Sequence, residues 1–241
     1  LSDTTPPFEQ VFLLSVISLA IGLPMVIRVW RQTAYTFRPN ALGGLYAVRG
    51  LSTFIGVSAW FFAIAVLPLA EAVALHFTLP IIGLILSVVI LGEHITRPRW
   101  LAVIIGFTGV LIILRPGAEA FNIMALVVFL SAAGYASGDI CTKLLSRTEP
   151  ARLIVVNLNI YLVLFSAIPT VMDWHTPAVS DIPMILMMGV TAWTAHMCLA
   201  QAMKRANASV IIPIEFIRLP LTALAAYIFF AEIPGVWTMV G

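Results

Sequence analysis

The sequence predicts an all-α, polytopic membrane protein made of two inverted repeats. Three observations support this fold class: an apolar composition, apolar blocks of membrane-spanning length, and an internal repeat. Of the 241 residues, 61% are hydrophobic and 10% are charged, and the mean hydropathy is +1.05. Soluble domains are typically about 45–50% apolar and about 25% charged. This chain therefore has too little polar surface to cover a water-soluble globule.

The apolar blocks are close to the roughly 20 residues that cross a bilayer as a helix. Short connectors that carry Pro, Gly and Asn, the residues typical of turns, separate them. The blocks do not alternate apolar and polar residues as the strands of a transmembrane barrel do. The predicted spans are 11–29, 45–67, 70–91, 100–114, 121–142, 153–172, 183–203 and 209–231, with a ninth that begins near 235 and is cut off.

Lys and Arg gather in alternate connectors, which supports the span count independently of hydropathy. Ten of the 13 basic residues lie in the connectors after the first, third, fifth and seventh spans. Arg115 is the exception in a loop, and Arg49 and Arg218 lie within spans. Basic loops face the cytoplasm, so we expect these connectors to be cytoplasmic and the Leu1 end to lie outside.

The internal repeat relates two stretches by a constant shift. Gly50–Glu93 resembles Gly189–Glu232, 139 positions later in the chain, and the shift places His76 on Glu215. Inverted repeats of this kind are typical of alternating-access transporters.

The two halves are expected to contain five spans each. A chain of this type normally starts inside, so we expect one further span before Leu1 and a complete ninth span at the other end. Five is an odd number, so the second half is inverted relative to the first. The predicted repeats are residues 1–117, lacking the first helix, and 118–241, lacking most of the last helix.

Short motifs in residues 45–117 point to a known family. They are Leu67-Pro68-Leu69-Ala70-Glu71-Ala72, Leu91-Gly92-Glu93, Arg99-Trp100 and Leu114-Arg115-Pro116-Gly117. On these motifs the chain resembles the EamA-type branch of the drug/metabolite transporter (DMT) superfamily. The second half resembles the S-adenosylmethionine uptake transporters of that superfamily, through Gly138-Asp139, Lys143 and Ile212-Pro213. The resemblance implies ten helices in two five-helix repeats, a bacterial inner-membrane location and movement of a small metabolite.

Three polar residues within spans are the main candidates for a site. An Arg or Asp at the centre of a membrane helix costs about 2.5–3.5 kcal/mol, so it needs a partner or a wet cavity. Glu215 and Arg218 are three apart and share a helix face, where they form either a structural pair or a substrate or proton site. His76, the repeat partner of Glu215, is either buried and hydrogen-bonded or a titrating gate.

Other candidates carry weaker signals. His196 either contacts substrate or hydrogen-bonds a neighbouring helix. Trp60, Tyr135 and Trp193 could stack on a flat or cationic ligand, and packing or lipid contact is the alternative for each.

Two basic residues near the cytoplasmic ends of spans are expected to reach that surface. Asp139 and Lys143, four apart, are interpreted as a snorkelling pair, with a substrate role for Asp139 as the alternative. Arg49 is expected to snorkel in the same way.

Gly134 and Gly138 form a face of small residues on the span 121–142. Such a face lets two helices approach closely, so we expect helix packing there. The motif does not predict an oligomeric state, and a homodimer stays open.

The predicted function is secondary transport of a small organic metabolite by alternating access. The substrate would be amino-acid-like, nucleoside-like or cofactor-like, with S-adenosylmethionine among the candidates. An intramembrane enzyme or a non-transporting scaffold is the alternative. The sequence has no His-Glu-x-x-His zinc motif and no P-loop, so neither a metalloprotease nor direct use of ATP is expected.

The expected partners are a small-molecule substrate and the lipid bilayer. No metal, cofactor or nucleic acid is expected. Proton coupling through His76 or Glu215 and passive exchange both stay open, as do the direction of transport and the identity of the substrate.

Overall fold

A computed structural model describes residues 6–32, 39–67, 69–114, 123–218, 220, 221 and 228, and all the regular structure in these ranges is helical. This confirms the predicted all-α class. The elements are α1 (Pro7–Gln32), α2 (Pro39–Val66), α3 (Leu69–His76), α4 (Leu79–Val89), α5 (Arg97–Leu114), α6 (Ile123–Ser146), α7 (Ala151–Met172), α8 (Ile182–Arg205) and α9 (Ala208–Ile211), with two 3-10 segments, η2 (Val179–Asp181) and η3 (Ile212–Ile217).

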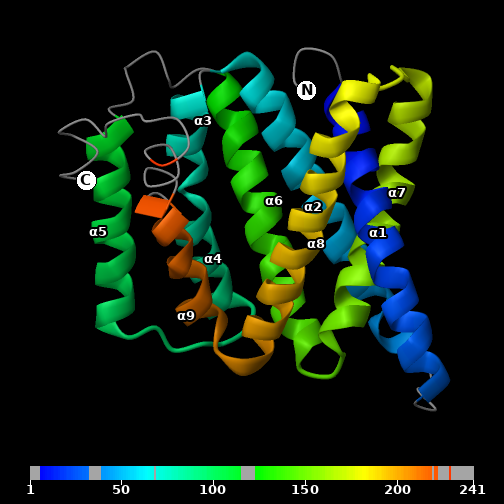
Figure 1. Cartoon of the computed structure of the whole chain (residues 1–241). Coiled ribbons are helices and arrows are strands. Elements are labelled where there is room, and N and C mark those ends of the chain that lie inside the picture. The colour runs from blue at the N-terminus through cyan, green and yellow to red at the C-terminus, as the bar shows by residue number, and fades with distance from the viewer. Residues whose placement is uncertain are drawn as a thin grey trace.

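The helices run up and down between the two ends of one bundle (Figure 1). The α4–α5, α6–α7 and α8–α9 connections and the end of α1 lie together at one end, which we call the basic end because it carries Arg28, Arg97, Lys143, Arg147 and Lys204. The gathering of basic residues at one end of the bundle therefore agrees with the alternation read from the sequence.

Helix α6 is the centre of the bundle and packs closely on α2. A Cβ atom on Gly134 would lie 2.7 Å from both Gly56 N and Ser52 O, and one on Gly138 would lie 2.5 Å from Thr53 Oγ1. Ser131 Oγ also donates a hydrogen bond of 2.7 Å to Gly56 O. The small-residue face of α6 is therefore occupied by α2 of the same chain and is not available to a second copy.

The predicted span 70–91 is broken into α3 and α4 at residues 77–78. Pro80 has no N–H, so it cannot bond the carbonyl of His76 as an α-helix requires. Thr78 Oγ1 donates instead to the carbonyl of Leu75 at 2.8 Å and stabilises the tight turn. A continuous apolar stretch thus contains a break that hydropathy alone does not reveal.

The predicted span 209–231 also departs from a regular α-helix. After one turn in α9 the backbone tightens into η3, which contains Pro213. Its later part, and the predicted ninth span, lie largely outside the described residues. In the part of the chain that the structure describes, five helices are long and apolar enough to cross a membrane, fewer than the eight spans predicted. The two interrupted spans account for part of this difference.

Arg49 does not snorkel to the surface, so that prediction is wrong. The residue is 2% exposed, and its side chain hydrogen-bonds to two other helices, α6 and α7. Arg49 Nε donates to Thr142 Oγ1 and Nη1 donates to the carbonyl of Ile154, both at 2.7 Å. A guanidinium has several donors, and these contacts offset part of the cost of burying its charge.

The predicted pair between Asp139 and Lys143 is also wrong. Lys143 Nζ donates to the carbonyls of Met203 and Ala206, both at 2.7 Å. Among the described residues, no ion pair joins Lys143 to Asp139. The helix spacing places the two side chains on one face of α6, but the carbonyls at the end of α8 are the partners of the lysine.

Candidate substrate cavity

A cavity of about 480 Å³ lies between the two halves of the chain. It is lined from α1, α2, α6, α7, α8, the α3–α4 break and η3, and its volume is typical of a small-molecule site. Six of the seven predicted binding or gating residues line it: Trp60, His76, Tyr135, His196, Glu215 and Arg218.

His76 lies between two aromatic rings at the end of α3. The imidazole centroid is 4.6 Å from the Trp60 ring and 5.5 Å from the Tyr135 ring, the latter in an edge-on arrangement. His76 Nε2 is buried and has no hydrogen-bond partner among the described residues. Because a buried ring nitrogen normally finds a partner, this atom is available to a ligand in the cavity.

Glu215 and Arg218 reach the same cavity from the other half of the chain. With His76 and Trp60 they also line a smaller void of about 20 Å³, large enough for one water molecule. Both repeat-related positions, His76 and Glu215, therefore contribute to the wall of one site, and the side chain of neither is confined to the lipid-facing surface.

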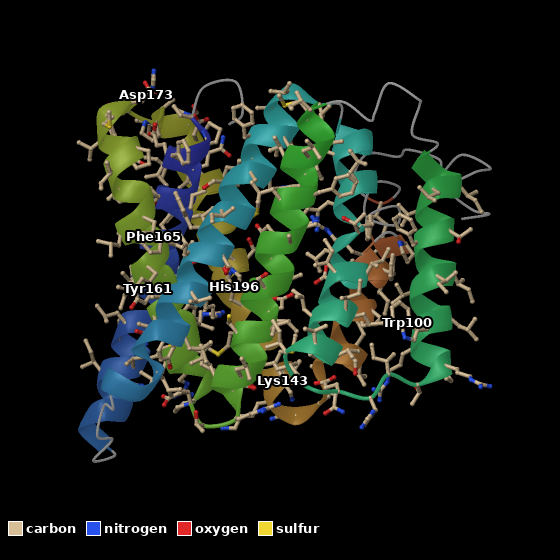
Figure 2. All side chains as sticks on the ribbon, turned by 180° about the vertical axis from the view of Figure 1, so that it is seen from behind. Trp100, Lys143, Tyr161, Phe165, Asp173 and His196 are labelled. Carbon is tan, nitrogen blue, oxygen red and sulfur yellow. The ribbon has the colours of Figure 1, made fainter. Side chains whose placement is uncertain are left out.

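Trp193 is the predicted residue that does not line the cavity. Its side chain is 7% exposed and packs with Val26, Leu153 and Val156 of α1 and α7. The indole fits against Gly22, where a Cβ atom would lie 2.2 Å from the ring. His196 is three positions further along α8 and lines the cavity, so two positions close together on one helix surface have different neighbours (Figure 2 labels His196).

Asp139 also lines the cavity, although the sequence favours a pair with Lys143 over a substrate role for it. It is four residues after Tyr135 on α6, so both side chains share the cavity face. Thr53 of α2 and Thr191 of α8 also line the cavity. The spacing of Asp139 from Tyr135 is the signal that could have identified it, but the apparent pair with Lys143 offered a competing explanation.

The described residues contain no group of three or more His, Cys, Asp or Glu that could hold a metal ion. The polar lining consists instead of two carboxylates, one guanidinium, two imidazoles and hydroxyl groups. This set can bind a charged or hydrogen-bonding organic ligand, while the aromatic rings offer flat apolar surface.

A helical membrane bundle with a cavity at two interrupted helices has the architecture of a secondary transporter. Comparison with known proteins supports this class and also identifies the family. The chain belongs to the EamA-like transporter family of the DMT superfamily, whose model matches residues 1–115 and again residues 122–241. The family resemblance read from the sequence motifs is thus confirmed.

Several bacterial transporters are similar to this chain over most of its length. An S-adenosylmethionine uptake transporter of Rickettsia bellii is 30% identical over 242 residues, which cover 97% of this chain and 79% of the relative. A riboflavin transporter of Vibrio cholerae is 31% identical over 193 residues, or 79% of this chain and 65% of the relative. A pseudopaline exporter of Pseudomonas aeruginosa is 27% identical, covering 100% of this chain and 84% of the relative.

A crystal structure supports the fold independently. It superposes with a TM-score of 0.80 at 18% sequence identity and covers 99% of this chain and 84% of the solved chain. At this identity the likeness concerns the fold alone.

Proposed function

We propose that this protein is a secondary transporter that moves a small organic metabolite by alternating access between two inverted repeats, residues 1–117 and 118–241. One observation carries the proposal: two helix interruptions related by the repeat shift meet at one cavity. Helices α3 and α9 begin at Leu69 and Ala208, 139 positions apart (208 − 69). The chain becomes α-helical again at Leu79 and at Arg218, which differ by the same shift (218 − 79).

The two interrupted segments run in opposite directions. In Figure 1, α3 and α4 descend toward the basic end, whereas α9 and the segment after it rise from that end. Inverted segments are equivalent when the site opens to either side, so a rocking motion exchanges their environments. The two family matches, one in each half, support the same division.

S-adenosylmethionine is the first substrate to test. The cavity offers Trp60 and Tyr135 to a flat ring, the carboxylates of Asp139 and Glu215 to a sulfonium or ammonium group, and the guanidinium of Arg218 to a carboxylate. The similarity to S-adenosylmethionine uptake transporters supports this choice. Riboflavin is the second candidate, because other relatives carry that name and its ring system is flat.

The proposal places the protein in a bacterial inner membrane with the basic end in the cytoplasm. It is then a carrier and not an enzyme. Proton coupling through His76 or Glu215 stays a prediction, which uptake measurements with and without a pH gradient would decide. A homodimer also stays a prediction, although the face of Gly134 and Gly138 cannot be its interface.

The test is binding and uptake by the purified protein. A thermal-shift assay compares S-adenosylmethionine with riboflavin, since a ligand that binds the folded state raises its apparent stability. Uptake is then measured in proteoliposomes for the wild type, His76→Ala and Glu215→Gln, with Asp181→Asn as a control outside the cavity. We expect both cavity variants to lose most uptake. No shift and no uptake with either compound would contradict the substrate assignment, and normal uptake in both variants would contradict the site.

A further inference from the structure

The turn between α8 and α9, residues 206–207, is held by charged side chains from other parts of the chain. Glu93, in the connector after α4, accepts a hydrogen bond from Ala208 N to Oε1 and one from Ser209 N to Oε2, both at 2.9 Å. Asn207 occupies the N-cap position of α9 but makes no side-chain capping bond. Glu93 therefore satisfies the free N–H groups of α9 from more than 100 positions away in the chain.

Lys143 holds the other side of the same turn. Its ammonium group donates to the carbonyls of Met203 and Ala206 at the end of α8, each at 2.7 Å. Figure 2 shows Lys143 at the basic end of the bundle, where α6 meets the α8–α9 turn. A cation thus lies at a helix C-terminus and an anion at the next helix N-terminus, so both charges match the helix dipoles.

A third contact strengthens the attachment to the first half of the chain. Arg99 Nη1, in the first turn of α5, donates to Ser209 Oγ at 2.8 Å. Ser209 is fully buried, as is Ala208 beside it. Two charged residues of the first half, Glu93 and Arg99, therefore contact consecutive positions of α9.

Beneath this turn, a buried apolar layer separates the basic end from the cavity. It contains Ile140, Met203, Ala208 and Ile212, which come from α6, α8, α9 and η3. Ile140 and Met203 come after the last cavity residues of their helices, Asp139 and Leu199, and both helices run toward the basic end, so this layer lies between the cavity and the turn. Because Met203 and Ala208 flank the α8–α9 turn, the packing of this layer depends on the position of the turn.

The turn also determines where two cavity residues lie. Helix α9 has four residues and continues directly into η3, which carries Glu215 and leads to Arg218. A helix of one turn is not stable by itself, so its position depends on the contacts around it. A displacement of the turn is therefore passed to Glu215.

We propose that Glu93 and Lys143 form a latch that closes the cavity at the basic end and positions Glu215. The latch is made when the α8–α9 turn rests on α4 and α6, as in this structure, and it is broken when the cavity opens to that end. Glu93 and Lys143 are positioning residues and do not touch the substrate. That these contacts form and break during transport rests on the proposed function. That they close the cavity at the basic end does not depend on it.

The test measures access to the cavity from the basic end without any substrate. Ala195, on the cavity face of α8, is changed to Cys in a background where Cys141 and Cys198 are Ala. A membrane-impermeant maleimide is applied to either side of oriented vesicles, and the labelling rate is measured. The latch variants are Glu93→Ala, Glu93→Gln and Lys143→Met.

We expect each latch variant to label faster from the basic end, by about tenfold, because losing one charged hydrogen bond costs at least about 1.4 kcal/mol. Asp181→Asn is the matched control for Glu93, since Asp181 occupies the N-cap of α8 without a side-chain capping bond. Lys204→Met is the control for Lys143, because Lys204 is exposed at the same end. Both controls should label at the parental rate.

Unchanged labelling from the basic end in Glu93→Gln and Lys143→Met would overturn the latch. These variants keep nearly the volume of the native side chains, so they decide the question even where Glu93→Ala fails to fold. Labelling requires no transport, so a failure of the latch is distinguishable from a wrong substrate or a wrong function. With an active substrate in hand, the variants should lower kcat more than they raise KM, because they act on the closing step.

Discussion

The imidazole of His76 lies 4.6 Å from the indole of Trp60, centroid to centroid, while its own Nε2 atom is buried without a hydrogen-bond partner among the described residues. The contact joins the end of α3, where the helix breaks, to the C-terminal part of α2. It gives the cavity both a flat apolar surface and an unsatisfied polar atom at one point. A ligand with a flat polar ring could stack on the indole of Trp60 and hydrogen-bond to Nε2 of His76. Ligand contact is therefore best tested at these two residues.

Replacing Trp60 with Ala should weaken substrate binding. The stacking of a flat ring on an aromatic side chain contributes about 1–3 kcal/mol, which corresponds to at least about a fivefold rise in KM. Trp60→Phe keeps a ring and should retain part of the affinity. Trp100→Ala is the matched control, since Trp100 is partly exposed on α5 and does not line the cavity. Equal KM values for Trp60→Ala and the wild type would refute the contact.

Arg49→Met should destabilise the protein. The substitution removes two hydrogen bonds of 2.7 Å that join α2 to α6 and α7, and it leaves the carbonyl of Ile154 without this donor. Hydrogen bonds to charged groups contribute about 1.5–3 kcal/mol each, so we expect a clear fall in the thermal unfolding temperature in detergent. Arg49→Lys keeps the positive charge but lacks the several N–H donors of a guanidinium. Its unfolding temperature should lie between those of the wild type and Arg49→Met. Arg152→Met, at an exposed position of the same end, should be neutral.

Gly134→Ala should loosen the contact between α2 and α6. The added methyl group would lie 2.7 Å from the backbone of Gly56 and Ser52, which cannot move independently of α2. Overpacking of this kind costs about 1–3 kcal/mol. Gly44→Ala is the control in α2, because nothing lies within 4 Å of its Cβ position. There the Ala should be neutral or stabilise the helix by about 0.5–1 kcal/mol. The unfolding temperatures of the two variants provide the comparison.

The contact between Glu93 and α9 should depend on pH. Burial raises the pKa of the Glu93 carboxyl, but the hydrogen bonds from Ser209 and Ala208 and the nearby charge of Lys143 outweigh it and lower the pKa below its ordinary value of 4.5. A lowered pKa means that the contact stabilises the folded state above about pH 4.5 and that this contribution is lost as the pH falls through the lowered pKa. The stability of the wild type should therefore approach that of Glu93→Gln in acid.

The measurement is the unfolding temperature of wild type and Glu93→Gln between neutral and acidic pH. We expect a constant difference near neutrality that shrinks in acid. The same comparison with Asp181→Asn should show no such convergence, because the Asp181 side chain makes no capping bond. A difference that does not change with pH would mean that the charge of Glu93 is not what holds the turn.

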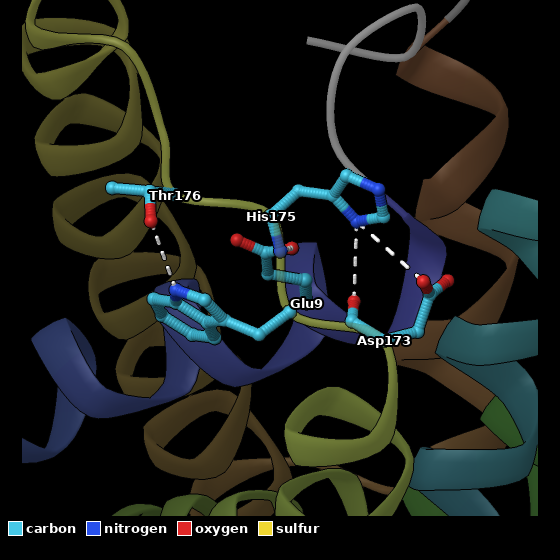
Figure 3. Close-up of polar contacts among 5 residues, drawn as sticks. Glu9, Asp173, His175 and Thr176 are labelled. Carbon is cyan, nitrogen blue, oxygen red and sulfur yellow. Dashed lines mark hydrogen bonds and ion pairs between the residues drawn. The ribbon is translucent and has the colours of Figure 1, made fainter.

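A further cluster at the opposite end of the bundle shows how much the fold adds to a local sequence. Glu9 is fully buried, and its Oε2 accepts a hydrogen bond of 3.1 Å from His175 N, while His175 Nδ1 lies 3.7 Å from Asp173 (Figure 3). Glu9 and His175 are 166 positions apart. Nothing in the local sequence of either residue indicates the other, because the contact depends on how α1 meets the connector after α7.

The repeat shift explains why several cavity residues could be predicted from the sequence. The shift predicts His76 and Glu215 as site residues because they occupy equivalent positions, and a polar side chain in an apolar span must find a polar environment. Both line the cavity. Trp193 and His196 show the limit of this reasoning: both lie in the same apolar span, and only the direction of each side chain decides that one packs on Gly22 while the other faces the cavity.

The sequence by itself determined that the protein is helical, that it lies in a membrane, that its basic loops alternate, and that it belongs to a family with two related halves. These properties depend on composition and on spacing along the chain. Only the tertiary structure decided where the spans break, that Arg49 is buried, and that Lys143 and Glu93 hold the α8–α9 turn. The physical reason is that lipid and protein interior are both apolar, so hydropathy does not distinguish them. A polar group, in turn, takes its partner from whichever helix is adjacent in space.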